Sequence, residues 1–148
     1  MTATSQRLMY GLGYAGLLPF LAFTLGVWFL DNYLQALSLR GFIVYSLAIL
    51  CFLGGTLWGS AMHRPNRAKL PRLVISNGIV IFAVVAVLVS QPVVCAFLLM
   101  LGQLATLWYE RSSSESGGWY LQFRSRLTTV AVVLHLLFMT GLVIRNGV

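Results

Sequence analysis

The chain has 148 residues, of which 59% are hydrophobic and only 9% are charged. Soluble domains carry roughly 25% charged residues, so this composition excludes an ordinary soluble globular domain. The net charge of +7 does not indicate a nucleic-acid partner, because the cations lie in short segments between long apolar runs, where membrane topology explains them. We therefore expect a multi-pass membrane protein that binds no nucleic acid.

Five apolar segments define the predicted architecture, and in chain order they cover residues 8–30, 41–62, 73–90, 92–109 and 127–144. Each falls within the roughly 17–25 residues that an α-helix needs to cross the hydrocarbon core of a bilayer. The sequence therefore predicts an all-α integral membrane bundle of five transmembrane helices, which forms a single membrane domain over residues 1–148.

The first segment and the connection after it contain two marked residues. Pro19 lies in the middle of the segment and predicts a kink, because proline lacks a backbone donor. Asp31 opens the predicted connection 31–40 and is one of only three acidic residues in the chain. We interpret Asp31 as a solvated loop carboxylate or an interfacial cap, and a proton or cation site at the membrane face is the alternative.

The second segment ends in a small-residue pair and a basic stretch. Gly55 and Gly59 are four residues apart and predict a helix face that packs closely against a neighbour. Trp58 lies between them, near the end that faces the loop. The loop 63–72 contains four cations, which indicate a cytoplasmic loop in contact with anionic lipid head groups; a specific phosphate site is the alternative. These cations are Arg64, Arg67, Lys69 and Arg72.

The last three segments contain the polar residues that are unusual inside a membrane. Gln91 and Pro92 separate the third and fourth segments and predict a tight hairpin. Asn77, Gln103 and His135 form a candidate intramembrane polar site, because polar side chains in lipid need partners. His135 is either functional or simply bonded to a neighbouring helix, and Gln103 is a plausible partner for it.

The distribution of lysine and arginine predicts the orientation. The N-terminal tail and the loops after the second and fourth segments together carry eight of these cations, and the other side carries Arg40 and Arg145. Cytoplasmic loops are enriched in lysine and arginine. We therefore expect a bacterial inner-membrane protein with its N-terminus in the cytoplasm and its C-terminus in the periplasm.

The sequence shows no pattern that is typical of an active site. It has no glycine-rich phosphate loop, metal-ligand cluster or nucleophile elbow. His63 and His135 are far apart and have no carboxylate nearby in sequence. Cys51 and Cys95 lie inside apolar segments, where they behave as small hydrophobic residues. We therefore expect no enzyme activity, no catalytic residue, and no metal or other cofactor.

Three segments taken together resemble a known family. They are residues 14–19 (YAGLLP), residues 52–59 (FLGGTLWG) and residues 119–128 (WYLQFRSRLT). In this order and spacing the chain resembles a family of small five-span membrane proteins of unknown function, which occur in proteobacteria and, as a mitochondrial transmembrane protein, in animals. The resemblance implies an inner-membrane location and five spans, and it implies no activity, cofactor or catalytic residue.

Aromatic and basic residues near the predicted cytoplasmic face suggest a binding surface. We expect Trp58, Trp119, Tyr120 and Arg124 to form a cluster there, with the arginine over an aromatic face. This cluster is either purely structural or in contact with a lipid head group or a partner. The candidate lipid- or partner-binding residues are Trp58, Arg64, Arg67, Trp119, Tyr120 and Arg124. The sequence favours a non-enzymatic accessory, assembly, lipid-binding or partner-binding protein. The alternative is a small-solute or ion transporter or channel, for which a homo-oligomer is one form.

Overall fold

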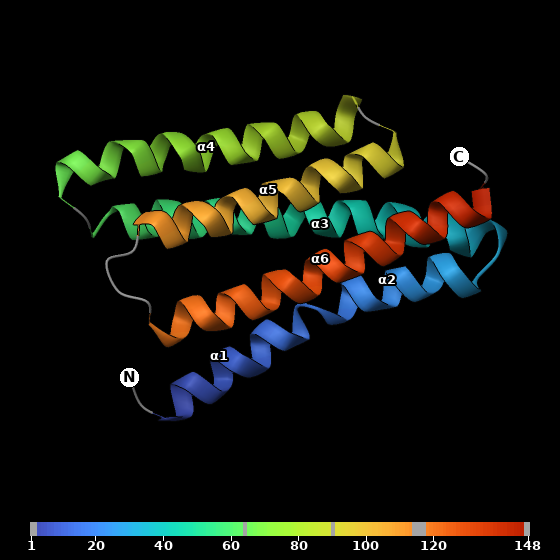
Figure 1. Ribbon diagram of the computed structural model, residues 1–148, viewed down its shortest axis with the longest axis horizontal. Coiled ribbons are helices and arrows are strands. Elements are labelled where there is room, and N and C mark those ends of the chain that lie inside the picture. Colours follow the sequence, from blue (N-terminus) through green and yellow to red (C-terminus); the bar gives the residue numbers. More distant parts are fainter. Residues whose placement is uncertain (1–2, 64, 90, 114–117, 147–148) are drawn as a thin grey trace. The chain divides into compact units, whose positions relative to one another are not determined.

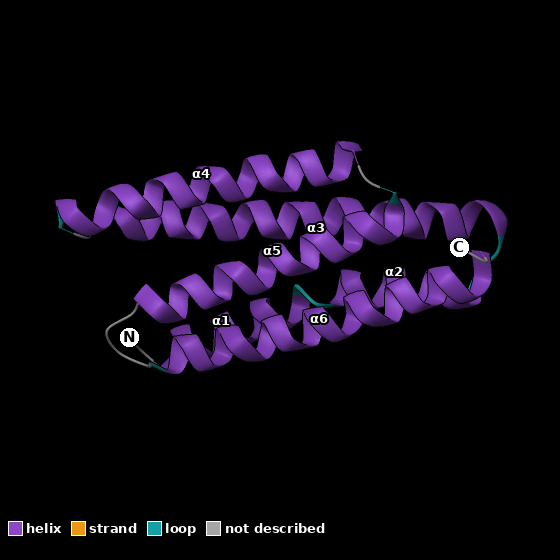
Figure 2. Cartoon of the chain, turned by 45° about the horizontal axis from the view of Figure 1, so that its top comes forward, coloured by secondary structure: helices purple, strands orange, loops and turns teal. Residues whose placement is uncertain are grey.

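The computed structural model describes residues 3–63, 65–89, 91–113 and 118–146 (Figure 1). Within these ranges every regular element is an α-helix, and no strand occurs (Figure 2). The helices are α1 (Ala3–Ala15), α2 (Leu18–Phe29), α3 (Asn32–Ala61), α4 (Asn66–Val89), α5 (Pro92–Ser113) and α6 (Trp119–Asn146).

Five helical stretches in the described part of the chain are long and apolar enough to cross a membrane. They are Gln6–Phe29, Asn32–Ala61, Lys69–Leu88, Pro92–Ser113 and Trp119–Arg145. Large apolar side chains cover much of the surface; Phe52 and Leu88, for example, are 67% and 79% exposed. Such a surface suits lipid rather than water. The prediction of an all-α membrane bundle with five spans is confirmed.

The helices pack into two compact units, and the boundary between them falls inside α3. Unit 1 is Met1–Phe42 with Glu115–Val148, and it contains α1, α2, the start of α3 and α6. Unit 2 is Ile43–Ser114, and it contains the rest of α3 with α4 and α5.

In unit 1, α1 and α2 form one crossing with a break in the middle. The break lies at Gly16–Leu17, and Pro19 follows in the first turn of α2, where its missing N–H costs no helical hydrogen bond. The predicted kink is therefore a full interruption. Helix α6 lies along both pieces (Figure 1): Tyr10 packs against Phe123 with ring centroids 4.5 Å apart.

The other end of α6 lies beside α2. The indole Nε1 of Trp28 donates a hydrogen bond to the carbonyl of Leu137 at 3.0 Å. The first and fifth crossings therefore run in the same direction, as two odd-numbered spans must. The start of α3 returns along α2, where the rings of Phe20 and Phe42 meet edge to face at 5.2 Å.

Helix α3 begins nine residues earlier than the predicted span, so the predicted connection 31–40 is wrong. Only Leu30 and Asp31 lie between α2 and α3. Asn32 adopts a left-handed conformation, with φ of 50°, which asparagine tolerates better than most residues. The segment that follows, NYLQALSLR, is rich in leucine, alanine and glutamine, which favour a helix. The helix therefore continues through the polar stretch instead of starting at the apolar one.

Two other helices also begin before their predicted spans. Helix α4 begins at Asn66, which places Arg67, Lys69 and Arg72 on a helix rather than in a loop. Pro71 lies in the second turn of α4 and removes only one backbone bond near the helix end. Helix α6 begins at Trp119, eight residues before the predicted start of the fifth span.

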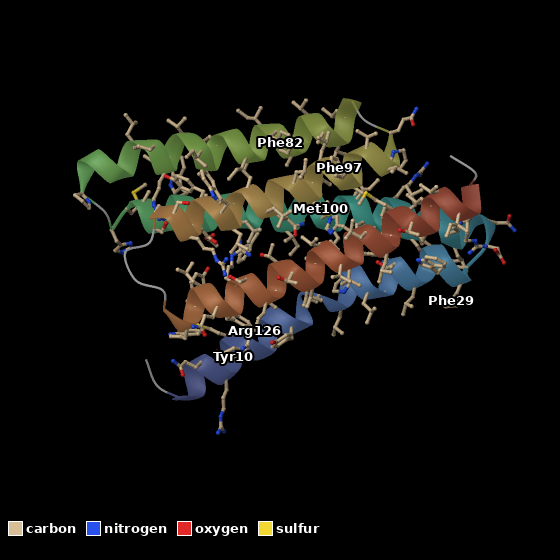
Figure 3. The ribbon with its side chains drawn as sticks, viewed as in Figure 1. Tyr10, Phe29, Phe82, Phe97, Met100 and Arg126 are labelled. Atoms are coloured by element: carbon tan, nitrogen blue, oxygen red, sulfur yellow. The ribbon has the colours of Figure 1, made fainter. Side chains whose placement is uncertain are left out.

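In unit 2, α4 and α5 form the predicted tight hairpin (Figure 1). Helix α4 ends at Val89 and α5 begins at Pro92; Ser90 lies outside the described residues. Phe82 of α4 projects toward α5 (Figure 3) and would touch a Cβ atom added at Gly102. The remainder of α3 completes the unit around a core of buried apolar side chains, namely Leu50, Ala83, Cys95 and Leu99.

The close approach of α3 to α4 occurs at Gly54 and not at the predicted pair Gly55 and Gly59. A Cβ atom at Gly54 would lie 3.1 Å from the carbonyl oxygen of Ser76, whereas one at Gly55 or Gly59 would meet no described atom within 4 Å. Ser76 Oγ also donates a hydrogen bond to the Gly54 carbonyl at 2.6 Å. The predicted packing role of Gly55 and Gly59 is therefore wrong within the described structure, and the residue next to them has that role.

Replacement of these adjacent glycines by valine should change the stability of the protein by different amounts. We expect Gly54→Val to lower the free energy of unfolding by about 1–3 kcal/mol, because the side chain would be forced against the α4 backbone. Gly55→Val adds the same side chain in open space and serves as the matched control. Thermal unfolding in detergent micelles measures both. Equal stabilities for the two variants would contradict the close approach at Gly54.

Candidate functional site

A buried arginine joins the ends of three helices in unit 2. Arg72, in α4, is only 4% exposed. Its guanidinium donates one hydrogen bond to Ser60 Oγ in α3 at 2.7 Å and one to Ser113 Oγ in α5 at 2.5 Å. Its Cζ atom also lies 5.7 Å from the ring centroid of Tyr109. One cation therefore holds α3, α4 and α5 together at the end that the sequence predicts to be cytoplasmic.

The hydroxyl groups of the two serines are oriented to accept these hydrogen bonds. Ser60 Oγ donates its own proton to the Leu57 carbonyl at 2.9 Å, and Ser113 Oγ donates to the Tyr109 carbonyl at 2.8 Å. Each hydroxyl oxygen thus offers its lone pairs to the guanidinium. A planar guanidinium with several N–H donors reaches two acceptors at once, which a lysine ammonium on its flexible stem does less well.

Further cations and indoles lie near Arg72 along the same helix ends. Lys69, one turn earlier in α4, is half-buried, and Arg111 is exposed in the last turn of α5. Trp58 and Trp108 are 43% and 71% exposed, as is common for indoles at a membrane interface. We call this part of unit 2 the basic end; it comprises Trp58, Lys69, Arg72, Trp108 and Arg111.

Two of the predicted binding residues, Arg64 and Arg67, lie wholly or partly outside the described part of the structure. Arg64 lies outside the described residues. Arg67 lies in the first turn of α4, and its side chain is outside the described part of the structure. Their predicted contact with lipid head groups therefore stays a prediction.

The start of α6 in unit 1 contains three more of the predicted binding residues, Trp119, Tyr120 and Arg124. The rings of Trp119 and Tyr120 meet edge to face at 6.2 Å, and Tyr10 packs against Trp119 at 5.9 Å. Tyr120 is 44% exposed, whereas Arg124 is buried. The structure thus brings Trp119 and Tyr120 together. Trp58 belongs to unit 2, so the predicted cluster of all four residues stays a prediction.

The predicted intramembrane polar residues have bonding partners within their own units. Gln103 of α5 is buried and donates to Ser46 Oγ of α3 at 3.2 Å. Asn77 is exposed and donates to the Leu73 carbonyl of its own helix at 2.9 Å. Polar side chains in lipid are expected to find such partners in neighbouring helices or in their own backbone.

His135 is fully buried in an aromatic environment in unit 1. Its Nδ1 lies 2.8 Å from the Ala131 carbonyl of its own helix. Its ring is 4.8 Å from that of Phe42 and 5.2 Å from that of Phe20, and Phe42 stacks on Phe138 at 3.8 Å. His135 and Gln103 belong to different units, and their predicted pairing stays a prediction.

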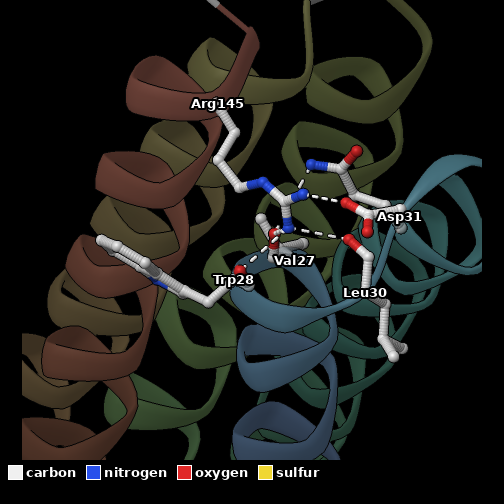
Figure 4. Close-up of polar contacts among 6 residues, drawn as sticks. Val27, Trp28, Leu30, Asp31 and Arg145 are labelled. Carbon is white, nitrogen blue, oxygen red and sulfur yellow. Dashed lines mark hydrogen bonds and ion pairs between the residues drawn. The ribbon is translucent and has the colours of Figure 1, made fainter.

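A second arginine anchors the end of α2 in unit 1 (Figure 4). Arg145 of α6 donates to the carbonyls of Val27, Trp28 and Leu30 at 3.0, 2.9 and 2.7 Å, and it forms an ion pair with Asp31. The last carbonyls of a helix lack intrahelical donors. A cation there also interacts favourably with the negative end of the helix dipole. Asp31 therefore acts as the ion-pair partner of an arginine that caps a helix.

Sequence reasoning missed the specific roles of Arg72 and Arg145. From the sequence, Arg145 counts only as a charge that determines orientation. The prediction that Arg72 lies in a loop and contacts lipid head groups is wrong, because Arg72 is buried in a helix and bonded to two serines. The available signal was weak: each lies beside a helix end, and Arg72 has serines near the ends of two other helices.

The described residues contain no group of three or more histidine, cysteine, aspartate or glutamate side chains that could hold a metal ion.

Comparison with known proteins gives one match. Residues 5–140 match the model of a family described as a protein of unknown function, DUF3429. No curated protein and no solved structure matches the chain.

The importance of Arg72 can be tested with its neighbour as the control. We expect Arg72→Met to lower the free energy of unfolding by about 2 kcal/mol, because it removes two charge-assisted hydrogen bonds from a buried position. Lys69→Met removes the same charge one turn away, from a half-buried position, and should change stability by less than about 0.5 kcal/mol. Thermal unfolding in micelles measures both, and similar losses would contradict the anchor.

Arg145 and Asp31 should contribute unequally although they form one ion pair. We expect Arg145→Met to lower stability by about 1–2 kcal/mol, because three carbonyls lose a donor. Asp31→Asn should cost at most about 0.5 kcal/mol, because Asp31 is 73% exposed and its charge is screened. Unfolding at low and high salt measures both variants. A larger loss for Asp31→Asn would show that the ion pair, and not the capping, is important.

Proposed function

The chain belongs to the DUF3429 family of proteins of unknown function, and we propose that it is a non-enzymatic inner-membrane protein that acts by binding other membrane components. It binds anionic lipid head groups at its basic end and serves as an accessory or assembly protein for a membrane-protein partner or a second copy of itself. The observation that carries this proposal is the basic end itself, where cations and exposed indoles lie around three helix ends joined by Arg72.

The orientation follows from the charge distribution along the chain. Eight of ten lysines and arginines lie in segments on one side of the predicted spans. The positive-inside rule places this side in the cytoplasm, which puts the N-terminus in the cytoplasm and the C-terminus in the periplasm. Anionic lipids attract such cations with about 1 kcal/mol each near the membrane surface. The cytoplasmic leaflet of the inner membrane in which we propose that the protein lies provides such lipids.

The bonds of the polar residues favour binding over transport. A transporter or channel for ions or small solutes, the alternative function, would use Asn77, Gln103 and His135 to line a polar path. Asn77 instead bonds to its own helix, and Gln103 bonds to Ser46 across a helix contact. His135 is enclosed by aromatic rings. These are the arrangements expected of residues that hold helices together.

Neutralisation of two cations of the basic end tests the proposal. The protein is extracted from bacterial membranes in mild detergent and examined by native mass spectrometry. We expect phosphatidylglycerol to remain bound to the wild type, and we expect it to fall several-fold in the Lys69→Gln, Arg111→Gln double variant. Arg40→Gln removes a charge from the predicted periplasmic side and serves as the control. A lipid-free monomer without any co-purified protein would overturn the proposal.

A further inference from the structure

The first crossing of unit 1 is interrupted near its middle by a short link between α1 and α2 (Figure 2). The Leu17 N–H donates to the Tyr14 carbonyl at 3.0 Å, three residues back, which tightens the chain at the end of α1. Pro19 follows and has no N–H to offer the Ala15 carbonyl four residues earlier. Gly16 lies in the link, where a residue without a Cβ atom adapts most easily to a change in backbone angles. The link therefore has the features of a hinge.

Helix α2, on one side of the link, is held by its neighbours along its whole length. Near its start, the ring of Phe20 lies 5.2 Å from those of Phe42 and His135. At its end, Trp28 donates a hydrogen bond to α6, and Arg145 of α6 donates to the last carbonyls of α2. Four of its residues are buried, namely Phe20, Thr24, Gly26 and Val27.

Helix α1, on the other side of the link, lies on the surface of unit 1. Within its described residues 6–15 every side chain is exposed or half-buried, and Leu12 is 66% exposed. Its contact with α6 is built from rings: Tyr10 and Tyr14 pack against Phe123 with centroids 4.5 and 5.8 Å apart. Segments with few buried contacts open at the lowest free energies in a protein. The two halves of the first crossing therefore differ in how firmly they are attached.

The ring of Phe123 fits closely against one glycine of α1. A Cβ atom added at Gly13 would overlap this ring and would lie 2.9 Å from Cδ1 of Leu127. A Cβ atom added at Gly11, two residues earlier, would meet no described atom within 4 Å. Phe123 is only 7% exposed while α1 covers it. The closed contact therefore depends on the absence of a side chain at Gly13.

We propose that α1 is a hinged arm, which turns as one body about the link at Gly16 and Leu17. The arm is closed on α6 in this structure and opens away from it. When closed, it covers Phe123 and packs on Trp119, where Tyr10 lies 5.9 Å from the indole. When open, it exposes both rings to the membrane, so it controls access to one side of the predicted binding residue Trp119. This inference goes beyond the proposed function, which holds whether or not the arm moves.

Electron–electron distance measurements between pairs of spin labels test the movement. The full chain, with Cys51 and Cys95 replaced by alanine, is placed in nanodiscs of phosphatidylcholine and phosphatidylglycerol. Labels at Leu12→Cys of α1 and Val133→Cys of α6 report on the arm. Labels at Leu25→Cys of α2 and Val133→Cys form the control pair. We expect two distance populations for the arm pair, with the shorter one dominant, and one population for the control pair.

Two alanine substitutions test what holds the arm closed. We expect Gly13→Ala to raise the ratio of open to closed arm about tenfold, which corresponds to about 1.4 kcal/mol, because the new methyl group meets the ring of Phe123. Gly11→Ala adds the same group to the same helix in open space, and it should change the ratio by less than about twofold. Phe123→Ala removes the ring itself and should also open the arm. Helical content by circular dichroism shows that each variant is folded.

Three results would overturn the inference. A single narrow population for the arm pair in the wild type would show that α1 is a fixed part of unit 1. Equal ratios in Gly11→Ala and Gly13→Ala would show that the ring of Phe123 does not hold the arm. A control pair that splits together with the arm pair would show that α1 and α2 move as one body, without a hinge between them. The lipid retained by the Lys69→Gln, Arg111→Gln variant tests the proposed function separately from all three.

Discussion

The interior of a bilayer contains no water, and each polar group of this chain must therefore find its partner within the protein. Most hydroxyls do so on their own helix: Thr24, Thr106 and Thr140 each donate to the carbonyl four residues earlier at 2.7–2.8 Å. This bond makes a polar side chain compatible with an apolar helix face. Polar bonds between helices occur where backbones or hydroxyls come close, as at Gly54 and at Gln103. The packing of each unit thus depends on few interhelical polar contacts.

At the helix ends, arginine side chains provide the hydrogen-bond partners that polar groups need. Arg72 binds hydroxyls of two other helices, and Arg145 binds the carbonyls that end α2. Both use the guanidinium as a multiple donor, which allows one side chain to satisfy several acceptors at a level where water is scarce. Arg72 joins three helices that are consecutive in the chain, whereas Arg145 joins α6 to α2, which is distant in sequence. Each arginine therefore stabilises the contact between the helix ends that it joins.

The fold class and the number of spans could be predicted because length and apolarity alone decide them. The start of α3 could not, since residues 32–40 favour a helix whether or not they lie in lipid. Its end was predicted to within one residue, because His63, Arg64 and Pro65 follow the apolar segment. The choice between Gly54 and Gly55 depends on which face of α3 meets α4, and adjacent glycines look equivalent in sequence. Arg72 was visible as a charge, but its role depends on serines 12 and 41 residues away, which only the tertiary structure brings together.

The structure separates residues used for packing from residues that remain on the surface, and this separation supports a binding role. Among the cations, Arg72 and Arg145 form hydrogen bonds to neighbouring helices. Arg111 is exposed at a helix end, and Lys69 is only half-buried. The space beside Gly54 is occupied by the backbone of α4, whereas the space beside Gly78 is open. In unit 2 the exposed charge lies at the helix ends and the open space lies farther along α4, so the surface of this unit offers both polar and apolar contacts to a membrane component.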